Sequence, residues 1–229
     1  MKDMIQRVLV PFSLSPEQLA AFALYGQRLL EKNQVMNLTA ITQPEAVAQL
    51  HFADSLALTK VVDLTGKTVI DVGCGAGFPG VPLKIGVPSI SLTLLDSTAK
   101  RMDWLSKELL PELGLDALCL TGRAEELAAD RREQYDVAVS RAVARLNILC
   151  ELCLPFVKVG GRFLAMKGAA VREELEEAKN ALRLLGGELK ALEAYPIGDA
   201  AHYAVVIEKV RPTPARYPRR YTKIKQQPL

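Results

Sequence analysis

The chain has little cysteine, and that scarcity excludes a class of protein. Its 229 residues include four cysteines, all set in apolar segments, so a disulfide framework is not expected. Cys150 and Cys153 have the spacing of a redox or metal pair, but they lack a second pair and nearby histidines. We interpret them as thiols of the core and expect no metal site.

The sequence also lacks a long apolar run. No such run reaches the roughly 18 residues that a membrane span requires. The apolar patch near the start of the chain is brief and contains Pro11, so we expect no secretory signal and a cytoplasmic protein. Hydrophobic residues make up 49% of the chain and charged residues 24%, which is typical of one sizeable globular core with a small appendage.

The most informative segment is an apolar run that ends in a glycine-rich loop. Residues 68–72 are typical of a buried parallel strand, and Gly73, Gly75 and Gly77 follow at every second position. From Gly75 the loop matches the dinucleotide fingerprint G-x-G-x-x-G, and from Asp71 it matches the D-x-G-x-G-x-G of S-adenosylmethionine-dependent methyltransferases. An acid at the strand end suits a cationic sulfonium better than a pyrophosphate, which favours the second interpretation. A dinucleotide site and a purely structural turn stay open as alternatives.

Strands and helices alternate from residue 66 onward, which predicts a parallel sheet covered on both faces. We expect parallel strands at 68–72, 91–96, 117–121, 135–141 and 162–168, and then an antiparallel edge hairpin of 188–195 and 202–209 around a turn at 196–199. Helices are expected at 146–156, ended by Gly160-Gly161, and at 171–185. The predicted fold class is α/β, a doubly wound, Rossmann-like class I methyltransferase sheet of seven strands whose last hairpin is antiparallel.

The segment before this sheet is predicted to be a helical cap. Ser15-Pro16-Glu17-Gln18 and Thr42-Gln43-Pro44-Glu45 read as capping boxes that open two helices. On the second helix, His51 and Asp54 share one face, where they either reach a ligand or fix the cap against the core. We expect three parts: a cap at 1–65, a methyltransferase domain at 66–210 and a basic tail at 211–229.

Three strand ends supply candidates for binding an adenosine-like ligand. Asp96 ends the second strand about twenty residues after the glycine loop, where a carboxylate can hold a ribose, and this feature suits both cofactor classes. Ala124 and Glu125 follow the third strand, either beside an adenine or simply as a helix start favoured by the dipole. Arg141 ends a buried strand, which is costly unless its guanidinium meets an anion or a polar ligand.

The tail has a composition of its own. No acid follows Glu208, while arginines and lysines alternate with prolines and tyrosines. Such a segment, kept extended by its prolines, can neutralise phosphates and stack tyrosines on bases, although a disordered tail without a partner has the same composition. The candidate RNA-binding residues are Arg101, Lys167, Arg219, Arg220 and Lys223.

Six sequence blocks occur in an order that identifies a family. They are Asn37-Leu38-Thr39, His51 to Ser55, Asp71 to Leu83, Leu95 to Arg101, Ser140-Arg141-Ala142 and Met166-Lys167-Gly168. Together they resemble the bacterial small-subunit (16S) ribosomal RNA guanine-N7 methyltransferase G family, also called the glucose-inhibited division protein B family. The resemblance extends from the cap to the Tyr217-Pro218-Arg219-Arg220 stretch of the tail. Cys74 and Ala76 vary the loop without removing a glycine.

The resemblance implies an enzyme that transfers methyl from S-adenosyl-L-methionine to N7 of a guanine in 16S rRNA. Its partner would be this RNA or the small ribosomal subunit, and we expect a monomer without an obligate protein partner. The implied cofactor contacts, together with the loop glycine Gly75, are Gly73, Phe78, Asp96, Ser97, Thr98, Ala124, Glu125 and Arg141.

The expected chemistry needs no catalytic side chain. Guanine N7 has a free lone pair and no proton, so alignment with the sulfonium matters more than a general base. The Pro-Cys nucleophile setting of cytosine-C5 enzymes and the Asp/Asn-Pro-Pro-Tyr stretch of amino-nitrogen enzymes are both missing from the sequence. The alternatives are an NAD-dependent oxidoreductase and a non-catalytic adenosylmethionine sensor that binds RNA.

Overall fold

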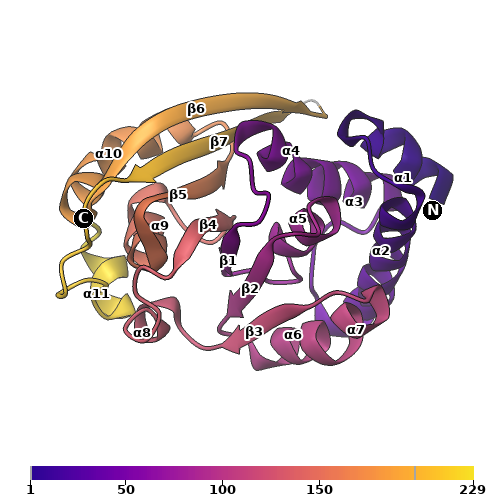
Figure 1. Ribbon diagram of the computed structural model, residues 1–229, viewed down its shortest axis with the longest axis horizontal. Helices are drawn as coiled ribbons and strands as arrows, with labels where there is room; N and C mark the ends of the chain where they lie inside the picture. The colour runs from indigo at the N-terminus through magenta and orange to yellow at the C-terminus, as the bar shows by residue number, and fades with distance from the viewer. Residues whose placement is uncertain (1, 199) are drawn as a thin grey trace.

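A seven-stranded sheet in the order β3-β2-β1-β4-β5-β7-β6 runs through the computed structural model, which describes residues 2–198 and 200–229 (Figure 1). Strands β1 to β5 are parallel, and β7 runs antiparallel to both β5 and β6. The strands are β1 Thr68–Val72, β2 Ser91–Asp96, β3 Ala117–Thr121, β4 Tyr135–Arg141, β5 Val157–Lys167, β6 Gly187–Ile197 and β7 Ala200–Lys209. The predicted fold class is therefore confirmed.

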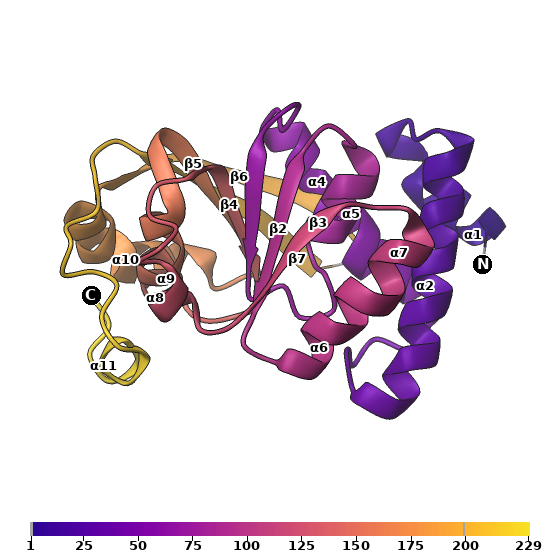
Figure 2. The same cartoon turned by 60° about the horizontal axis from the view of Figure 1, so that its bottom comes forward.

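Helices cover both faces of this sheet. The helices are α1 Lys2–Leu9, α2 Pro16–Met36, α3 Pro44–Val47, α4 Asp54–Val61, α5 Gly80–Gly86, α6 Ala99–Trp104, α7 Leu110–Leu113, α8 Ala124–Leu127, α9 Leu146–Cys153, α10 Val171–Leu185 and α11 Tyr221–Gln226. Helices α1 to α7 share one core cluster with the Val69 face of the sheet, and α8 to α11 share the other with the Ile70 face. Figure 2 shows these two layers on either side of the strands. Successive strand residues point to opposite faces, so each strand contributes to both clusters.

The first four strands coincide with their predicted ranges, but the start of β5 was predicted wrongly. Helix α9 ends at Cys153, and β5 begins at Val157 rather than at 162. The pair Gly160-Gly161 lies inside β5, where the register against β4 shifts. A Cβ on Gly161 would lie 2.6 Å from the carbonyl oxygen of Asp136. Glycine is needed there for close backbone approach and does not end a helix.

The edge hairpin is confirmed and is longer than predicted. Of the predicted turn, Pro196 and Ile197 belong to β6, Gly198 follows that strand, and residue 199 lies outside the described residues. The two strands pair from Gly187 with Lys209 to Ile197 with Ala200.

One of the two predicted capping boxes is confirmed. Gln18 N donates to the Ser15 hydroxyl at 3.3 Å, and Ser15 N donates to the Gln18 side chain at 2.8 Å. The second box is wrong, because α3 begins after Gln43 and no side chain caps it. Between α3 and α4, residues Ala48–Ala53 form a π-helical segment that carries His51. Such segments are frequent at functional sites.

The C-terminal segment is folded against the domain, which corrects the extended tail. Tyr217 and Ile224 are buried in the same core cluster as α9 and α10. The Arg132 guanidinium donates to the carbonyl oxygen of Thr213 at 3.0 Å and to that of Tyr217. The sequence prediction missed helix α11, because it gave the prolines and charges of the segment more weight than its single apolar Ile224.

Cys150 and Cys153 are buried in α9 as free thiols, in agreement with their interpretation as core residues. Across the described residues, no helix is both long and apolar enough to cross a membrane.

Candidate functional site

A cavity of about 400 Å³ lies at the carboxyl ends of the parallel strands. In doubly wound sheets this edge is where ligands bind. All nine residues predicted to hold the cofactor line it, together with Arg101: Gly73, Gly75, Phe78, Asp96, Ser97, Thr98, Ala124, Glu125 and Arg141. The lining also includes Leu38, Thr39, His51, Val143 and Tyr221, which the prediction did not assign to the cofactor.

The loop after β1 needs glycine at two positions. Gly73 has a φ of +76°, and a Cβ there would lie 2.5 Å from Cγ2 of Val143. Gly77 has a φ of +101°, and a Cβ there would lie 2.8 Å from the hydroxyl of Tyr25. The amides of Gly73 and Cys74 donate to the carbonyl oxygen of Leu95 at 2.8 and 3.0 Å, which ties the loop to β2. The loop is thus closely packed and backbone-lined.

Asp71 does not face the cavity, contrary to the role that favoured a cationic ligand. Its carboxylate is fully buried, and Oδ2 accepts a hydrogen bond from Gly80 N at 2.7 Å. Oδ1 has no hydrogen-bond partner within the described residues. Burial raises the pKa of Asp71 to about 7. Asp71, near the end of β1, therefore anchors the loop at Gly80, where the loop leads into α5.

Asp96 is held so that both carboxylate oxygens are oriented. Oδ2 accepts from Gly75 N at 2.9 Å, and Oδ1 accepts from Thr98 N at 2.8 Å. Each oxygen keeps a lone pair for a further donor, and the side chain lines the cavity. Thr98 occupies the N-cap position of α6, although its side chain makes no capping bond. This arrangement suits the vicinal hydroxyls of a ribose.

The β3 end of the cavity combines the start of α8 with the start of α11. Ala124 and Glu125 line the wall, and burial raises the pKa of Glu125. Tyr221 also lines it, and the Arg123 guanidinium lies 5.2 Å from the centre of the Tyr221 ring. We predicted that the tyrosines of the tail, Tyr221 among them, stack on RNA bases, and the basic residues around Tyr221 did not indicate that it would reach this cavity.

At the β4 end, Arg141 is bound by the N-terminal cap. Its Nη1 donates to the carbonyl oxygen of Leu50 at 2.8 Å and to Asp54 Oδ2 at 3.2 Å, and its Nη2 donates to His51 Nδ1 at 2.9 Å. The guanidinium carbon lies 4.9 Å from the centre of the Phe78 ring. Protein groups therefore compensate for most of the cost of burying this charge. The prediction had expected a ligand to do so.

Of the two roles predicted for His51 and Asp54, fixing the cap against the core belongs to both, and only His51 also lines the cavity. Asp54 Oδ1 accepts from the hydroxyl of Tyr195 at 3.0 Å and lies 2.9 Å from His202 Nδ1, so it joins the cap to the edge hairpin. His51 joins the cap to Arg141 and also lines the cavity. Burial and the neighbouring Arg141 lower the pKa of His51 to about 3, so the ring is neutral.

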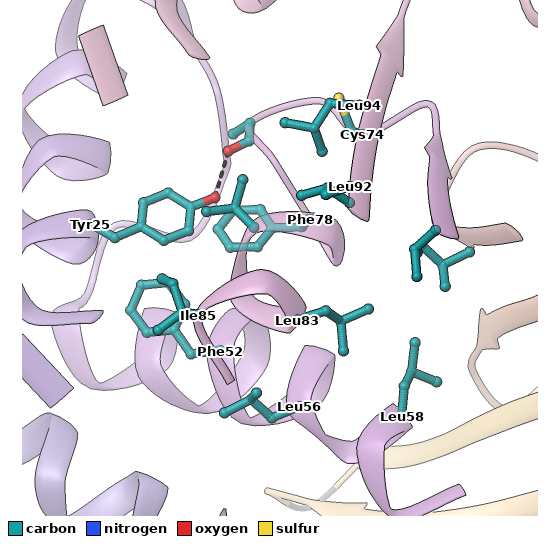
Figure 3. Close-up of a cluster of buried hydrophobic side chains, with 14 of the residues drawn as sticks. Tyr25, Phe52, Leu56, Leu58, Cys74, Phe78, Leu83, Ile85, Leu92 and Leu94 are labelled. Carbon is teal, nitrogen blue, oxygen red and sulfur yellow. Dashed lines mark hydrogen bonds between the residues drawn. The ribbon is translucent and has the colours of Figure 1, made fainter. Parts of the chain in front are cut away.

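Phe78 connects the loop to the cap. Its ring stacks on Tyr25 and His51, with centroid distances of 5.3 and 4.4 Å, and lies 6.1 Å from Phe52. The Tyr25 hydroxyl donates to the carbonyl oxygen of Ala76 at 2.6 Å. Figure 3 shows the Tyr25 and Phe78 rings side by side among the aliphatic residues of this core. Aromatic contacts from α2 and from the π-helical segment therefore fix the loop in place.

The predicted RNA-binding residues fall into two groups. Arg101 lines the cavity, and Arg220 and Lys223 are exposed. Lys167 is instead paired with Glu174 at 2.7 Å and donates to the carbonyl oxygen of Ala144. Arg219 pairs at 2.6 Å with Glu151, whose side chain is 1% exposed. The charges of Lys167 and Arg219 are thus neutralised within the chain.

Comparison with known proteins agrees with this arrangement. Residues 18–200 match the family described as rRNA small subunit methyltransferase G. A ribosomal RNA small subunit methyltransferase G from Alkaliphilus metalliredigens is 48% identical over 215 residues, which cover 91% of this chain and 90% of that protein. The protein of the same name from Exiguobacterium sp. is 46% identical, with 95% and 94% covered.

Solved structures support the fold. A putative S-adenosyl-L-methionine-dependent methyltransferase from Methanococcus maripaludis has a TM-score of 0.57 at 17% identity, covering 81% of this chain and 92% of that one. A methyltransferase from Pyrococcus furiosus has a TM-score of 0.55 at 12% identity, with 82% and 97% covered.

Proposed function

Because the chain belongs to the rRNA small subunit methyltransferase G family, we propose that it transfers a methyl group from S-adenosyl-L-methionine to N7 of a guanine in 16S rRNA. One observation carries the assignment of the site. Residues from the ends of four separate strands, chosen from the sequence as cofactor contacts, line a single cavity. A cavity of about 400 Å³ is within the range of small-molecule sites.

The residues present fit this cofactor. Asp96, with both oxygens oriented by backbone amides, would hold the ribose hydroxyls. Ala124, Glu125 and Tyr221 would bind the adenine, and the backbone from Gly73 to Gly75 would lie along the rest of the molecule. A side chain at Gly73 would collide with Val143, which also lines the cavity. When bound, the cofactor supplies the electrophilic methyl group.

The side chains act by positioning and by excluding water, and none serves as a general base. His51 is neutral, and its Nδ1 already accepts from Arg141, so that nitrogen is not available for a proton from substrate. Cys74 is buried beside Met102, and burial raises the pKa of its thiol well above the ordinary value, so it is not a nucleophile. Attack by the N7 lone pair releases no proton, so alignment accounts for the rate.

The RNA partner would approach over exposed cations. We propose contacts for Arg101, at the cavity, and for Arg220 and Lys223, on the C-terminal segment. The substrate is 16S rRNA or the small ribosomal subunit, acted on in the cytoplasm by a monomer. Lys167 and Arg219 are left out of this set because their charges are used internally.

The test is methyl incorporation into small ribosomal subunits from a strain that lacks the gene, followed by mass mapping of the modified nucleotide. Gly73→Asp should abolish incorporation while the fold survives, because the side chain enters the cofactor loop. Gly114→Asp is the matched control: it also has a positive φ, and no atom lies within 4 Å of its added Cβ. Wild-type activity in Gly73→Asp, or modification of a base other than guanine, would overturn the proposal.

A further inference from the structure

Hydrogen bonds to its backbone and to its hydroxyl hold Thr39 at the cavity. It lies between α2 and α3 and lines the cavity. Thr39 N donates to Asn33 Oδ1 at 2.8 Å, and Asn33 Nδ2 donates to the carbonyl oxygen of Thr39 at 2.9 Å. One side chain thus fixes both backbone polar groups of Thr39. The position of its hydroxyl is determined before any ligand enters.

The hydrogen bonds of His51 determine which way the Thr39 hydroxyl points. An arginine can only donate, so His51 Nδ1, 2.9 Å from Arg141 Nη2, is an acceptor. Leu50 O lies 3.2 Å from the same nitrogen, but Nδ1 cannot donate to it while it accepts from Arg141. A neutral imidazole with an acceptor at Nδ1 carries its hydrogen on Nε2. Nε2 therefore donates to Thr39 Oγ1, 2.8 Å away.

The Thr39 oxygen accepts a second hydrogen bond from Ile41 N at 3.0 Å. A hydroxyl has two lone pairs and one hydrogen, so both acceptor positions are occupied and only the hydrogen remains. Within the described residues, no acceptor for that hydrogen is found. Thr39 is thus a fixed hydrogen-bond donor toward whatever occupies this part of the cavity.

The location favours the methylated base over the adenosine. Thr39 is linked through His51 to Arg141, at the end of β4. The adenosine contacts lie at the ends of β2 and β3, and β3 is separated from β4 by two strands, a distance of about 14 Å. A cofactor anchored by its adenosine at β2 and β3 therefore extends its other end toward β1 and β4. The acceptor base has to enter beside that end.

We propose that the Thr39 hydroxyl donates to O6 of the target guanine and thereby selects guanine over adenine. This inference rests on the proposed function. In a purine, position 6 adjoins N7 on the same edge: guanine presents the O6 acceptor there, whereas adenine presents an amino donor. A hydroxyl whose lone pairs are both occupied cannot accept from that amino group. His51 is a positioning residue in this scheme, because it acts only through Thr39.

The test combines a change in the protein with a change in the RNA. Single-turnover methylation is measured for wild type, Thr39→Val and Thr39→Ser, on small subunits assembled from ligated 16S rRNA that carries either guanine or 2-aminopurine at the target. The analogue keeps N7 and lacks O6. We expect wild type to be about 10- to 100-fold slower on 2-aminopurine, because the Thr39 hydroxyl, a donor beneath the bound base, is left unpaired. Thr39→Val should be slower by a similar factor on guanine and show little further loss on 2-aminopurine, while Thr39→Ser should retain the wild-type pattern.

Three outcomes would overturn the inference. If Thr39→Val slows both substrates by the same factor, the hydroxyl has only a structural role. If the variant binds S-adenosylmethionine more weakly in calorimetry and its base preference is unchanged, the hydroxyl serves the cofactor. If wild type methylates both bases at the same rate, the inference is refuted without any variant. If Thr39→Val folds poorly, Thr39→Ala takes its place. Failure of wild type to methylate guanine would instead refute the proposed function.

Discussion

The cavity is bordered at its β4 and β3 ends by two parts of the chain that are attached in different ways. The N-terminal flank, residues 2–61, brings Thr39 and His51, and the C-terminal segment, residues 211–229, brings Tyr221. The flank is held by aromatic and aliphatic packing, with Phe22, Tyr25 and Phe52 fully buried in the core cluster that includes β1. The segment contributes few buried apolar side chains and relies strongly on polar contacts, such as the pair of Arg219 with Glu151.

These two kinds of attachment indicate which end of the site depends on the global fold. Apolar packing continuous with the core is lost only when the domain unfolds, whereas a segment with few apolar contacts opens locally at a lower free energy. We therefore expect the β4 end of the cavity to be as stable as the domain. At the β3 end, Tyr221 should leave the cavity at a lower free energy than global unfolding requires.

Truncating one buried side chain in each part should separate the two kinds of attachment most clearly. Phe52→Ala should lower the free energy of unfolding by about 3–5 kcal/mol, because it removes a buried ring from the shared core. Ile224→Ala removes an equally buried side chain but should change global stability by about 1 kcal/mol or less, since its segment can detach first. Urea unfolding measures the first quantity, and proteolysis of the C-terminal segment measures the detachment. Equal losses of global stability would remove the distinction.

Acid should weaken the N-terminal flank through His51. Its pKa is about 3 in the folded chain, below the ordinary value of 6.5, so between these values the unfolded state binds a proton that the folded state does not. Stability conferred by this residue is thus present above pH 6.5 and is lost as pH falls toward 3, by about 3 kcal/mol at pH 4. Asp71, with a raised pKa, changes stability in the opposite sense, so the measurement is wild type against His51→Gln at each pH. A difference between the two that is independent of pH would contradict this assignment.

At the other end of the cavity, Tyr221→Ala should weaken binding of S-adenosylmethionine about tenfold, as expected for the loss of one base-stacking surface. Tyr221→Phe should bind like wild type, because the ring is retained. Tyr203→Ala, on β7 and outside the cavity lining, is the control. Calorimetry without RNA gives the dissociation constants, and unaltered affinity in Tyr221→Ala would separate the C-terminal segment from the cofactor site.

The smallest effect concerns RNA binding by the exposed cations of the C-terminal segment. Replacing Arg220 and Lys223 with alanine should reduce the slope of log affinity against log salt by about 1–2, if each neutralises one phosphate. This double variant is preferable to deleting the segment, because deletion would also remove the buried Tyr217 and Ile224. Alanines at Arg172 and Lys179, exposed on α10, provide the control. A slope equal to that of wild type would exclude the two residues.

Prediction from sequence succeeded where one local physical signal dominated. The first four parallel strands are short and mostly apolar runs bounded by turn residues, so β1 to β4 were located to the residue. The Ser15 cap is similarly local. The glycine loop alone left two cofactor classes open. The family match and the antiparallel edge hairpin favour the methyltransferase over the oxidoreductase.

Prediction failed where a residue's role depends on distant partners. The burial of Asp71 beneath its own loop follows from contact with Gly80 and could not be inferred from charge at a strand end. Pairing of Lys167 with Glu174 on α10, and of Arg219 with Glu151 on α9, is equally non-local. Tyr221 lines the cavity at the start of a helix whose Ile224 is buried in the core, and one apolar residue in a basic segment is a weak signal.

The packing of Phe78 against Tyr25, His51 and Phe52 has a practical consequence for protein redesign. The conformation of residues 73–80 depends in part on helical segments that precede them in the chain. A chimera that imports only those eight residues into another doubly wound enzyme would therefore leave the Phe78 ring without its neighbours. The unit to exchange between enzymes is the glycine turn together with residues 16–61.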